Sequence, residues 1–140
     1  MGSTSEKERA TRAAGVRMSV GGLLLLAPGL GRILFGIPKG QDNAAVRLLA
    51  RLFGIRNIIL GGWALAAQEQ DAASRRACYQ LNAAVDAVDV VALAIAAVTG
   101  DGLVRAAVMG SVLGTGELLA WLDLAGDSST EVPQGSVALT

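Results

Sequence analysis

The chain has 140 residues, of which 52% are hydrophobic and only 17% are charged. A soluble domain of ordinary composition carries about 25% charged residues, so this chain would leave much of its surface apolar in water, whereas a lipid-facing surface removes that difficulty. Twelve basic and twelve acidic residues cancel, and aromatic residues are sparse, which argues against nucleic acid as a partner.

The predicted elements are four apolar helices in one domain. Residues 1–12 form a polar N-terminal segment, and the first span covers residues 13–35. Pro28 lies inside that span, and because proline removes a backbone donor and clashes with the preceding turn, we predict a kink or a break there. Each span is long enough to cross about 30 Å of hydrocarbon. The remaining predicted segments are spans at 44–67, 75–98 and 103–124, and a disordered tail at 125–140.

The predicted fold class is therefore all-α, a four-helix transmembrane bundle over residues 13–124. A soluble helical bundle stays open as an alternative, because the longest uncharged stretch, Met18 to Gly31, has 14 residues. Lys and Arg concentrate in the N-terminal segment and the second loop, which predicts a cell-membrane protein with both termini cytoplasmic. Gly110 and Gly114 could mark a homo-oligomer face, although close packing inside the bundle is the simpler interpretation.

The third span carries one polar stripe. Tyr79, Asn82, Asp86 and Asp89 recur at spacings of three and four, which places them on the same face of a helix. The other faces hold Ala, Val and Leu. Since lipid offers no hydrogen-bond partners, the stripe is predicted to face the interior of the bundle.

The neighbouring spans supply polar groups at matching depths, estimated from a rise of 1.5 Å per residue in antiparallel helices. The predicted contacts are Arg56 with Asp86, Arg51 with Asp89, and Glu117 with Asn82. Two arginines leave one of the three carboxylates unpaired, and a lone ionised carboxylate in hydrocarbon costs several kcal/mol. We expect that group to keep its proton, and Glu117 is the first choice.

A protonated acid beside apolar walls is suited to Brønsted acid catalysis. The candidate catalytic residues are Glu117, Asp86 and Asp89, and the candidate substrate-binding residues are Arg51, Arg56, Asn57, Asn82 and Tyr79. The chain has no His and a single cysteine, Cys78, which excludes an intrachain disulfide, Ser–His or Cys–His catalysis and any His-ligated metal. We expect no cofactor and no metal.

Charged and aromatic residues near the span ends are predicted to reach the membrane interface. Long basic side chains at such positions extend toward water, and tryptophans act as anchors there. The basic residues in this group are Arg17, Arg32, Arg47 and Arg105, and the tryptophans are Trp63 and Trp121.

The run RLFGIRN at 51–57, followed by Gly61, resembles a family of small, functionally uncharacterised four-span integral membrane proteins of bacteria and fungi. The segment FGIP at 35–38 and the pair Asp86 and Asp89 carry the same resemblance, which covers about residues 13–124. At Asn57 such runs often have Asp, so this chain departs from the pattern there. The resemblance implies the membrane fold and supplies no reaction.

Two functions stay open, and so does the question whether the protein is an enzyme. The first is acid–base catalysis on a lipophilic, isoprenoid-like substrate, of an isomerase, epoxide-opening or cyclase type. The second is a non-catalytic membrane subunit or small carrier that contacts membrane lipid. In that case the polar cluster has a structural role. A cavity beside Glu117 would favour the enzyme, because catalysis needs room for a substrate and structural contacts do not.

Overall fold

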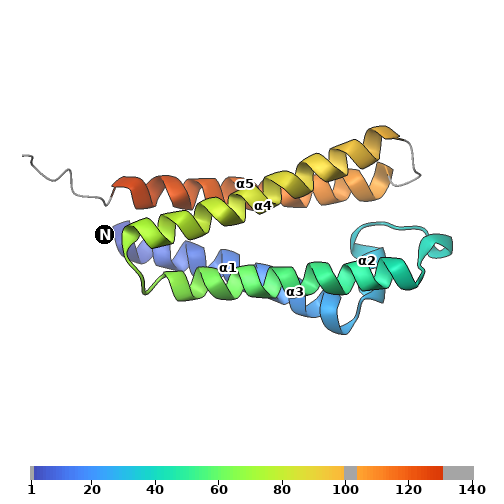
Figure 1. Cartoon of the computed structure of the whole chain (residues 1–140), viewed down its shortest axis with the longest axis horizontal. Helices are drawn as coiled ribbons and strands as arrows, with labels where there is room; N and C mark the ends of the chain where they lie inside the picture. Colours follow the sequence, from blue (N-terminus) through green and yellow to red (C-terminus); the bar gives the residue numbers. More distant parts are fainter. Residues whose placement is uncertain (1, 100–103, 131–140) are drawn as a thin grey trace, which may run out of the picture.

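The computed structural model describes residues 2–99 and 104–130, and this part of the chain contains helices and no strand (Figure 1). A short helix and one 3-10 turn connect the first long helix to the second. The long helices are α1 (Gly2–Leu26), α3 (Ala44–Ala67), α4 (Ala72–Thr99) and α5 (Val104–Thr130), and the short elements are α2 (Gly29–Leu34) and η1 (Lys39–Gln41).

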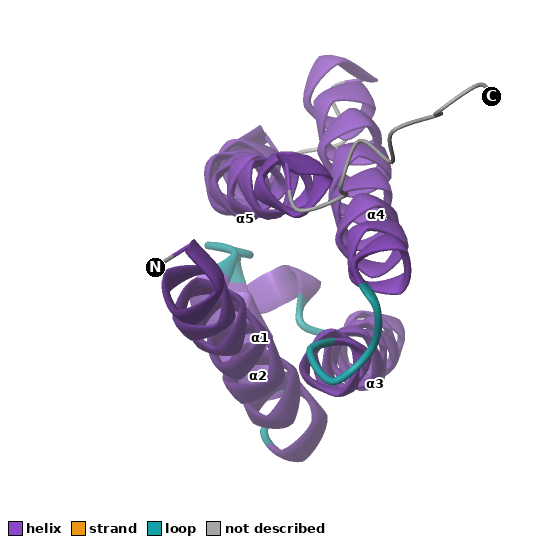
Figure 2. Ribbon diagram, turned by 90° about the vertical axis from the view of Figure 1, so that its left-hand side faces the viewer, coloured by secondary structure: helices purple, strands orange, loops and turns teal. Residues whose placement is uncertain are grey.

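The four long helices form two antiparallel pairs. Helix α1 packs along α3, and α4 packs along α5, whereas contacts between the pairs are much fewer. Figure 1 shows the two pairs as layers, and Figure 2, turned by 90°, shows α4 and α5 on one side and α1 and α3 on the other. The protein therefore consists of two helix pairs, and the groups that join them decide its architecture.

Glycines allow the close approach of α1 to α3. A Cβ on Gly54 would lie 2.6 Å from the Gly21 carbonyl oxygen and 2.9 Å from the Leu25 amide nitrogen, so only glycine fits at this crossing. In the other pair, a Cβ on Gly110 would lie 2.8 Å from Leu93. Gly110 thus packs against α4 of the same chain, which is the simpler of the two interpretations considered from the sequence.

Both ends of the chain are more helical than the sequence suggested. Helix α1 already begins at Gly2, and α5 continues to Thr130, so residues 125–130 are helical where a disordered tail was expected. The physical reason is a buried contact between the two ends: the Ser128 hydroxyl donates to Glu6 Oε1 at 2.7 Å. Residues 131–140 lie outside the described part of the chain. Around Pro28, α1 ends at Leu26 and α2 begins at Gly29.

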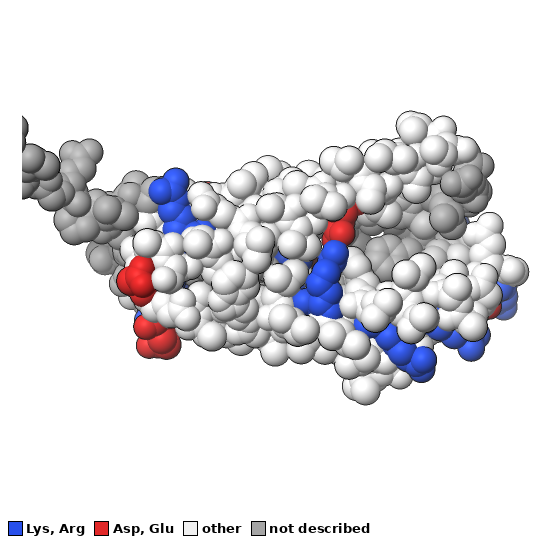
Figure 3. Space-filling view, viewed as in Figure 1, with Lys and Arg blue, Asp and Glu red and all other residues white. Residues whose placement is uncertain are grey.

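Packing is uneven along the bundle. One half, which we call the packed half, encloses the core, formed mainly by Ala10, Ala14, Ala64, Ala67, Cys78, Tyr79, Ala83, Trp121, Leu124 and Ala125. The opposite half, which we call the open half, comprises α2, residues 44–53 of α3, residues 87–99 of α4 and residues 104–116 of α5. No residue of 44–53 or 87–99 is buried. The face in Figure 3 is hollowed between the two layers toward this half.

Three helices, α3, α4 and α5 over Val104–Ser128, are long and apolar enough to cross a membrane. Large apolar side chains also face outward, with Leu26 85%, Val98 82% and Val112 68% exposed. Most of the face in Figure 3 carries no charged residue. An apolar surface of this extent suggests a membrane location, because monomeric soluble proteins rarely expose it.

Candidate functional site

The centre of the molecule holds a buried arginine from α1. Arg17 is 1% exposed, and its Nε donates to Asn57 Oδ1 at 2.9 Å. Its Nη1 donates to Asn82 Oδ1 at 3.0 Å and to Asp86 Oδ2 at 3.1 Å, and its Nη2 donates to Asp86 Oδ1. One guanidinium group therefore connects α1 to both α3 and α4 through a bidentate ion pair and two amide contacts.

Helix α5 adds two groups to the same guanidinium. Glu117 Oε2 lies 3.8 Å from Arg17 Nη1, and the Trp121 ring centroid lies 5.8 Å from Arg17 Cζ, a cation–π distance. The Glu117 side chain is 36% exposed and makes no hydrogen bond within the described residues. Arg17 thus contacts all three other long helices, and Glu117 is the carboxylate of this cluster that keeps free hydrogen-bonding capacity.

The two asparagines are fixed by their own helices. The Asn57 Nδ2 donates to the Phe53 carbonyl oxygen at 2.9 Å, and the Asn82 Nδ2 donates to the Cys78 carbonyl oxygen at 3.0 Å. Each amide is therefore held with its Oδ1 toward Arg17. Polar networks of this kind are stable in a low-dielectric interior only when their members are satisfied, and here they are.

A second ion pair lies beside the first and joins α3 to α4. Arg56 Nη1 donates to Asp89 Oδ1 at 2.8 Å, and its Nη2 donates to Asp89 Oδ2. The Phe53 ring centroid lies 4.5 Å from Arg56 Cζ, and Phe53 in turn meets Phe35 edge to face at 6.2 Å. This pair is half-buried, with side-chain exposures of 34% and 26%, so it borders the open half. Figure 3 shows a basic and an acidic side chain meeting between the two layers.

The inward-facing stripe of α4 is confirmed, because Tyr79, Asn82 and Asp86 are all buried. The predicted pairing across the helices is wrong. Arg56 pairs with Asp89 instead of Asp86, because Asp86 is already paired with Arg17.

The other two predicted contacts also differ. Arg51 is exposed and forms no ion pair with any described residue, so it does not meet Asp89. Asn82 and Glu117 both reach Arg17 rather than each other. The estimate of depth matched Arg56 with Asp86, whereas the structure pairs Arg56 with Asp89, three residues further along α4. It also left out α1, whose Arg17 lies between these groups.

Arg17 is the site residue that the sequence analysis missed, and Trp121 was placed wrongly with it. Arg17 was expected to extend to the interface, and Trp121 to anchor there, but both are 1% exposed. A signal for Arg17 was present: three carboxylates stood against two arginines, and Arg17, which directly precedes an apolar run, was a further candidate partner. Trp63 is 39% exposed.

Tyr79 lies in the packed half, where its ring meets Trp121 at a centroid distance of 5.9 Å. Its hydroxyl has no hydrogen-bond partner among the described residues. The tyrosine therefore supports the Arg17 cluster through Trp121 and does not line the open half.

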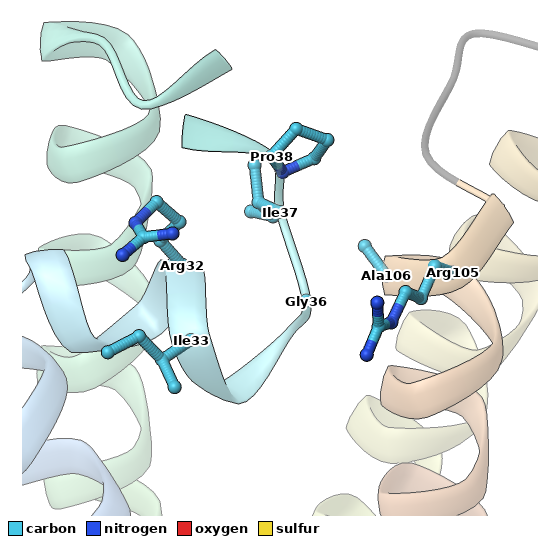
Figure 4. Close-up of a pocket in the computed structure, with 7 residues that line it drawn as sticks. All are labelled: Arg32, Ile33, Gly36, Ile37, Pro38, Arg105 and Ala106. Carbon is cyan, nitrogen blue, oxygen red and sulfur yellow. The ribbon is translucent and has the colours of Figure 1, made fainter. Parts of the chain in front are cut away.

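Among the clefts on the described part of the chain, one lies at each end of the bundle. The first, of about 440 Å³, lies between the end of α2 and the start of α5 (Figure 4). The second, of about 740 Å³, lies beside the first turns of α1 and includes Arg12 and Gln68. Glu117 lines neither of them. Among the described residues, no group of three His, Cys, Asp or Glu side chains is placed to hold a metal ion.

No protein-family model, curated protein or solved structure matches this chain. Any assignment of function therefore depends on the site. Its chemistry is that of a buried guanidinium with one carboxylate bound tightly, Asp86, and a second held loosely, Glu117. Such a pair of carboxylates in different surroundings is a common arrangement for separating a structural acid from a reactive one.

Proposed function

We propose that this protein is a four-span integral membrane protein that binds a lipophilic molecule in the open half and uses Glu117 as an acid–base group on it. The observation that carries this proposal is the uneven packing about the Arg17 cluster. On one side the helices enclose a core, and on the other residues 44–53 and 87–99 are left unburied. The polar cluster would then form the floor of a binding region with apolar walls.

The fourth span in this proposal is α1 continued by α2. Its charge at Arg17 is neutralised by Asp86, and its contact with α3 at Gly21 and Gly54 is too close for α1 to lie apart from a membrane-spanning α3. With Arg17 buried, the remaining basic residues at the N-terminal end still favour cytoplasmic termini. They are Lys7, Arg9, Arg12, Arg75 and Arg76.

The proposed chemistry is a proton shift within an alkene. The neutral Glu117 carboxyl gives its proton to one carbon of a double bond, which leaves a carbocation on the other carbon. The resulting carboxylate takes a proton from the next carbon beyond that cation, and the double bond moves by one position. The net reaction is an isomerisation that needs no further reactant. Arg17, at 3.8 Å, stabilises the carboxylate while it exists, and Asp86 stays bound to Arg17 throughout.

A second candidate function is non-catalytic. Arg17 makes four hydrogen bonds and reaches every other long helix, as a clamp between two helix pairs would require. Neither cleft reaches Glu117, which also favours this role. In that case the protein is a membrane subunit or a small carrier, and the polar cluster supplies stability alone.

Untargeted mass spectrometry of lipid extracts separates the two functions. A strain lacking the gene is complemented with wild type, with Glu117→Gln, or with Glu69→Gln as a matched control. Glu69 is an acid in the loop between α3 and α4 whose side chain is 84% exposed. We expect an isomeric lipophilic product with wild type and with Glu69→Gln, and none with Glu117→Gln at equal membrane levels.

Glu117→Gln should fold normally, because glutamine keeps the shape of the side chain and the lost ion-pair contact is a long one. Identical lipid extracts from the deletion strain and the three complemented strains would exclude catalysis by Glu117. The non-catalytic function, in which Arg17 holds the two helix pairs together, would then remain. Full product with Glu117→Gln would remove Glu117 from the chemistry.

A further inference from the structure

The cleft between α2 and α5 brings two arginines to one opening. Arg32 comes from α2 and Arg105 from the first turn of α5. Figure 4 shows Arg105 extending across the opening toward Gly36, whereas the Arg32 guanidinium is folded back over α2, away from Arg105. The rest of the lining is apolar or backbone: Ile33, Gly36, Ile37, Pro38 and Ala106. Guanidinium groups over apolar walls suit a ligand with an anionic head and an apolar body.

The backbone is shaped around Arg105. Gly36 adopts a positive φ of 62°, and a Cβ placed there would lie 3.1 Å from Arg105 Nε and 3.3 Å from its Cγ. Glycine is the residue that accepts this φ without strain, and it leaves room for the guanidinium. Arg105 forms no ion pair with any described residue, so its donors are available to a ligand.

Among the described residues, basic side chains outnumber acidic ones around the cleft. Asp42 is the described acid that pairs with Arg32, with its Oδ2 3.9 Å from Arg32 Nε. That carboxylate accepts two hydrogen bonds from Arg47, at 2.9 Å and 3.2 Å, and these lower the pKa of Asp42 below its ordinary value. Arg47 and Arg32 thus share the single charge of Asp42, and Arg105 forms no ion pair with any described residue.

The open half lies between this cleft and the polar cluster along the bundle. Twelve residues of α5 separate Arg105 from Glu117, which corresponds to roughly 18 Å along the helix axis. One leaflet of a bilayer has about half of the 30 Å hydrocarbon thickness, so the two lengths are similar. An amphiphile with its head at Arg105 would therefore extend a single apolar chain to the neighbourhood of Glu117.

We infer that the cleft between α2 and α5 binds the phosphate-type head of a single-chain amphiphile whose chain lies in the open half. The position of the chain rests on the proposed function, whereas the head site rests on Arg32, Arg105 and Gly36 alone. The same phosphate chemistry could come from a lipid or from free phosphate, and the choice of probes distinguishes them.

The test measures binding of three probes to the purified full chain in an uncharged detergent. They are hexadecyl phosphate, hexadecanol and inorganic phosphate. We expect hexadecyl phosphate to bind at least about tenfold more tightly than either of the other two probes. A tenfold gain in affinity is the effect expected from about one charge-assisted hydrogen bond. The variant Arg32→Gln/Arg105→Gln should lose that advantage.

Lys39→Gln is the matched control, because it removes one charge from exposed η1 near the cleft without altering the lining. It should bind hexadecyl phosphate within about twofold of wild type, as expected for an isolated surface charge. If the double variant unfolds at a lower temperature than wild type, the binding of hexadecyl phosphate by wild type is compared with that by Arg105→Gln alone. Arg105 is exposed, so this single substitution should not affect folding.

Equal binding of hexadecyl phosphate and hexadecanol would overturn the inference, and so would equally tight binding of inorganic phosphate. Full binding by the double variant would do the same. The two proposals have separate readouts: binding of hexadecyl phosphate tests the head site at Arg32 and Arg105, and the lipid extracts test the reaction at Glu117. Loss of the isomerase activity alone therefore leaves the head site intact.

Discussion

Arg17→Gln should lower the free energy of unfolding by about 3–5 kcal/mol, the loss typical of breaking a buried ion pair by removing one partner. The substitution leaves Asp86 buried without its counter-ion and removes the donor that Asn57 and Asn82 face. Reversible unfolding in mixed detergent micelles, followed by far-UV circular dichroism, measures this loss against wild type.

Two further variants make the test specific. Arg51→Gln removes an exposed arginine that forms no ion pair among the described residues, so it should change stability by no more than about 0.5 kcal/mol. Arg17→Met/Asp86→Leu should recover the part of the loss that comes from leaving Asp86 buried without a counter-ion, because apolar residues of similar size replace a buried pair at little cost. The part that comes from Asn57 and Asn82 should remain. Equal effects of Arg17→Gln and Arg51→Gln would contradict the ion pair.

Gly54→Ala should destabilise the protein by about 1–3 kcal/mol or more through overpacking. The added Cβ would lie 2.6 Å from the Gly21 carbonyl oxygen and 2.9 Å from the Leu25 amide nitrogen. Both are backbone atoms, so no side-chain rotation relieves the contact, and α1 must move away from α3. The same unfolding experiment in detergent measures the change.

Gly62→Ala is the control on the same helix, because a Cβ there meets nothing within 4 Å. Alanine in the interior of a helix is favoured over glycine by about 0.5–1 kcal/mol, so this variant should be neutral or more stable than wild type. Opposite signs for the two substitutions are therefore expected. If both variants destabilise by similar amounts, the close crossing of α1 and α3 is not as described.

The local pattern of the chain was sufficient to find the helices. The span predicted at 44–67 coincides with α3, and the one predicted at 75–98 lies within α4. Apolar runs bounded by Gly, Pro and polar residues determine these limits, and such signals act within one turn of the chain. The ends were underestimated because Glu6 and Ser128, 122 residues apart, stabilise each other's helices, and no local signal reports such a contact.

The sequence by itself determined that Tyr79, Asn82 and Asp86 face inward, because helical periodicity and the lack of partners in lipid leave one solution. Tertiary structure alone decided their partners. Asp86 and Asp89 are three residues apart, about 4.5 Å along the axis, so a small shift between helices exchanges the arginine that each one meets. Helix geometry gives the depth of a side chain but not which neighbouring helix faces it. In the structure α1 lies against α3 at Gly21 and Gly54, and Arg17 of α1 pairs with Asp86 of α4.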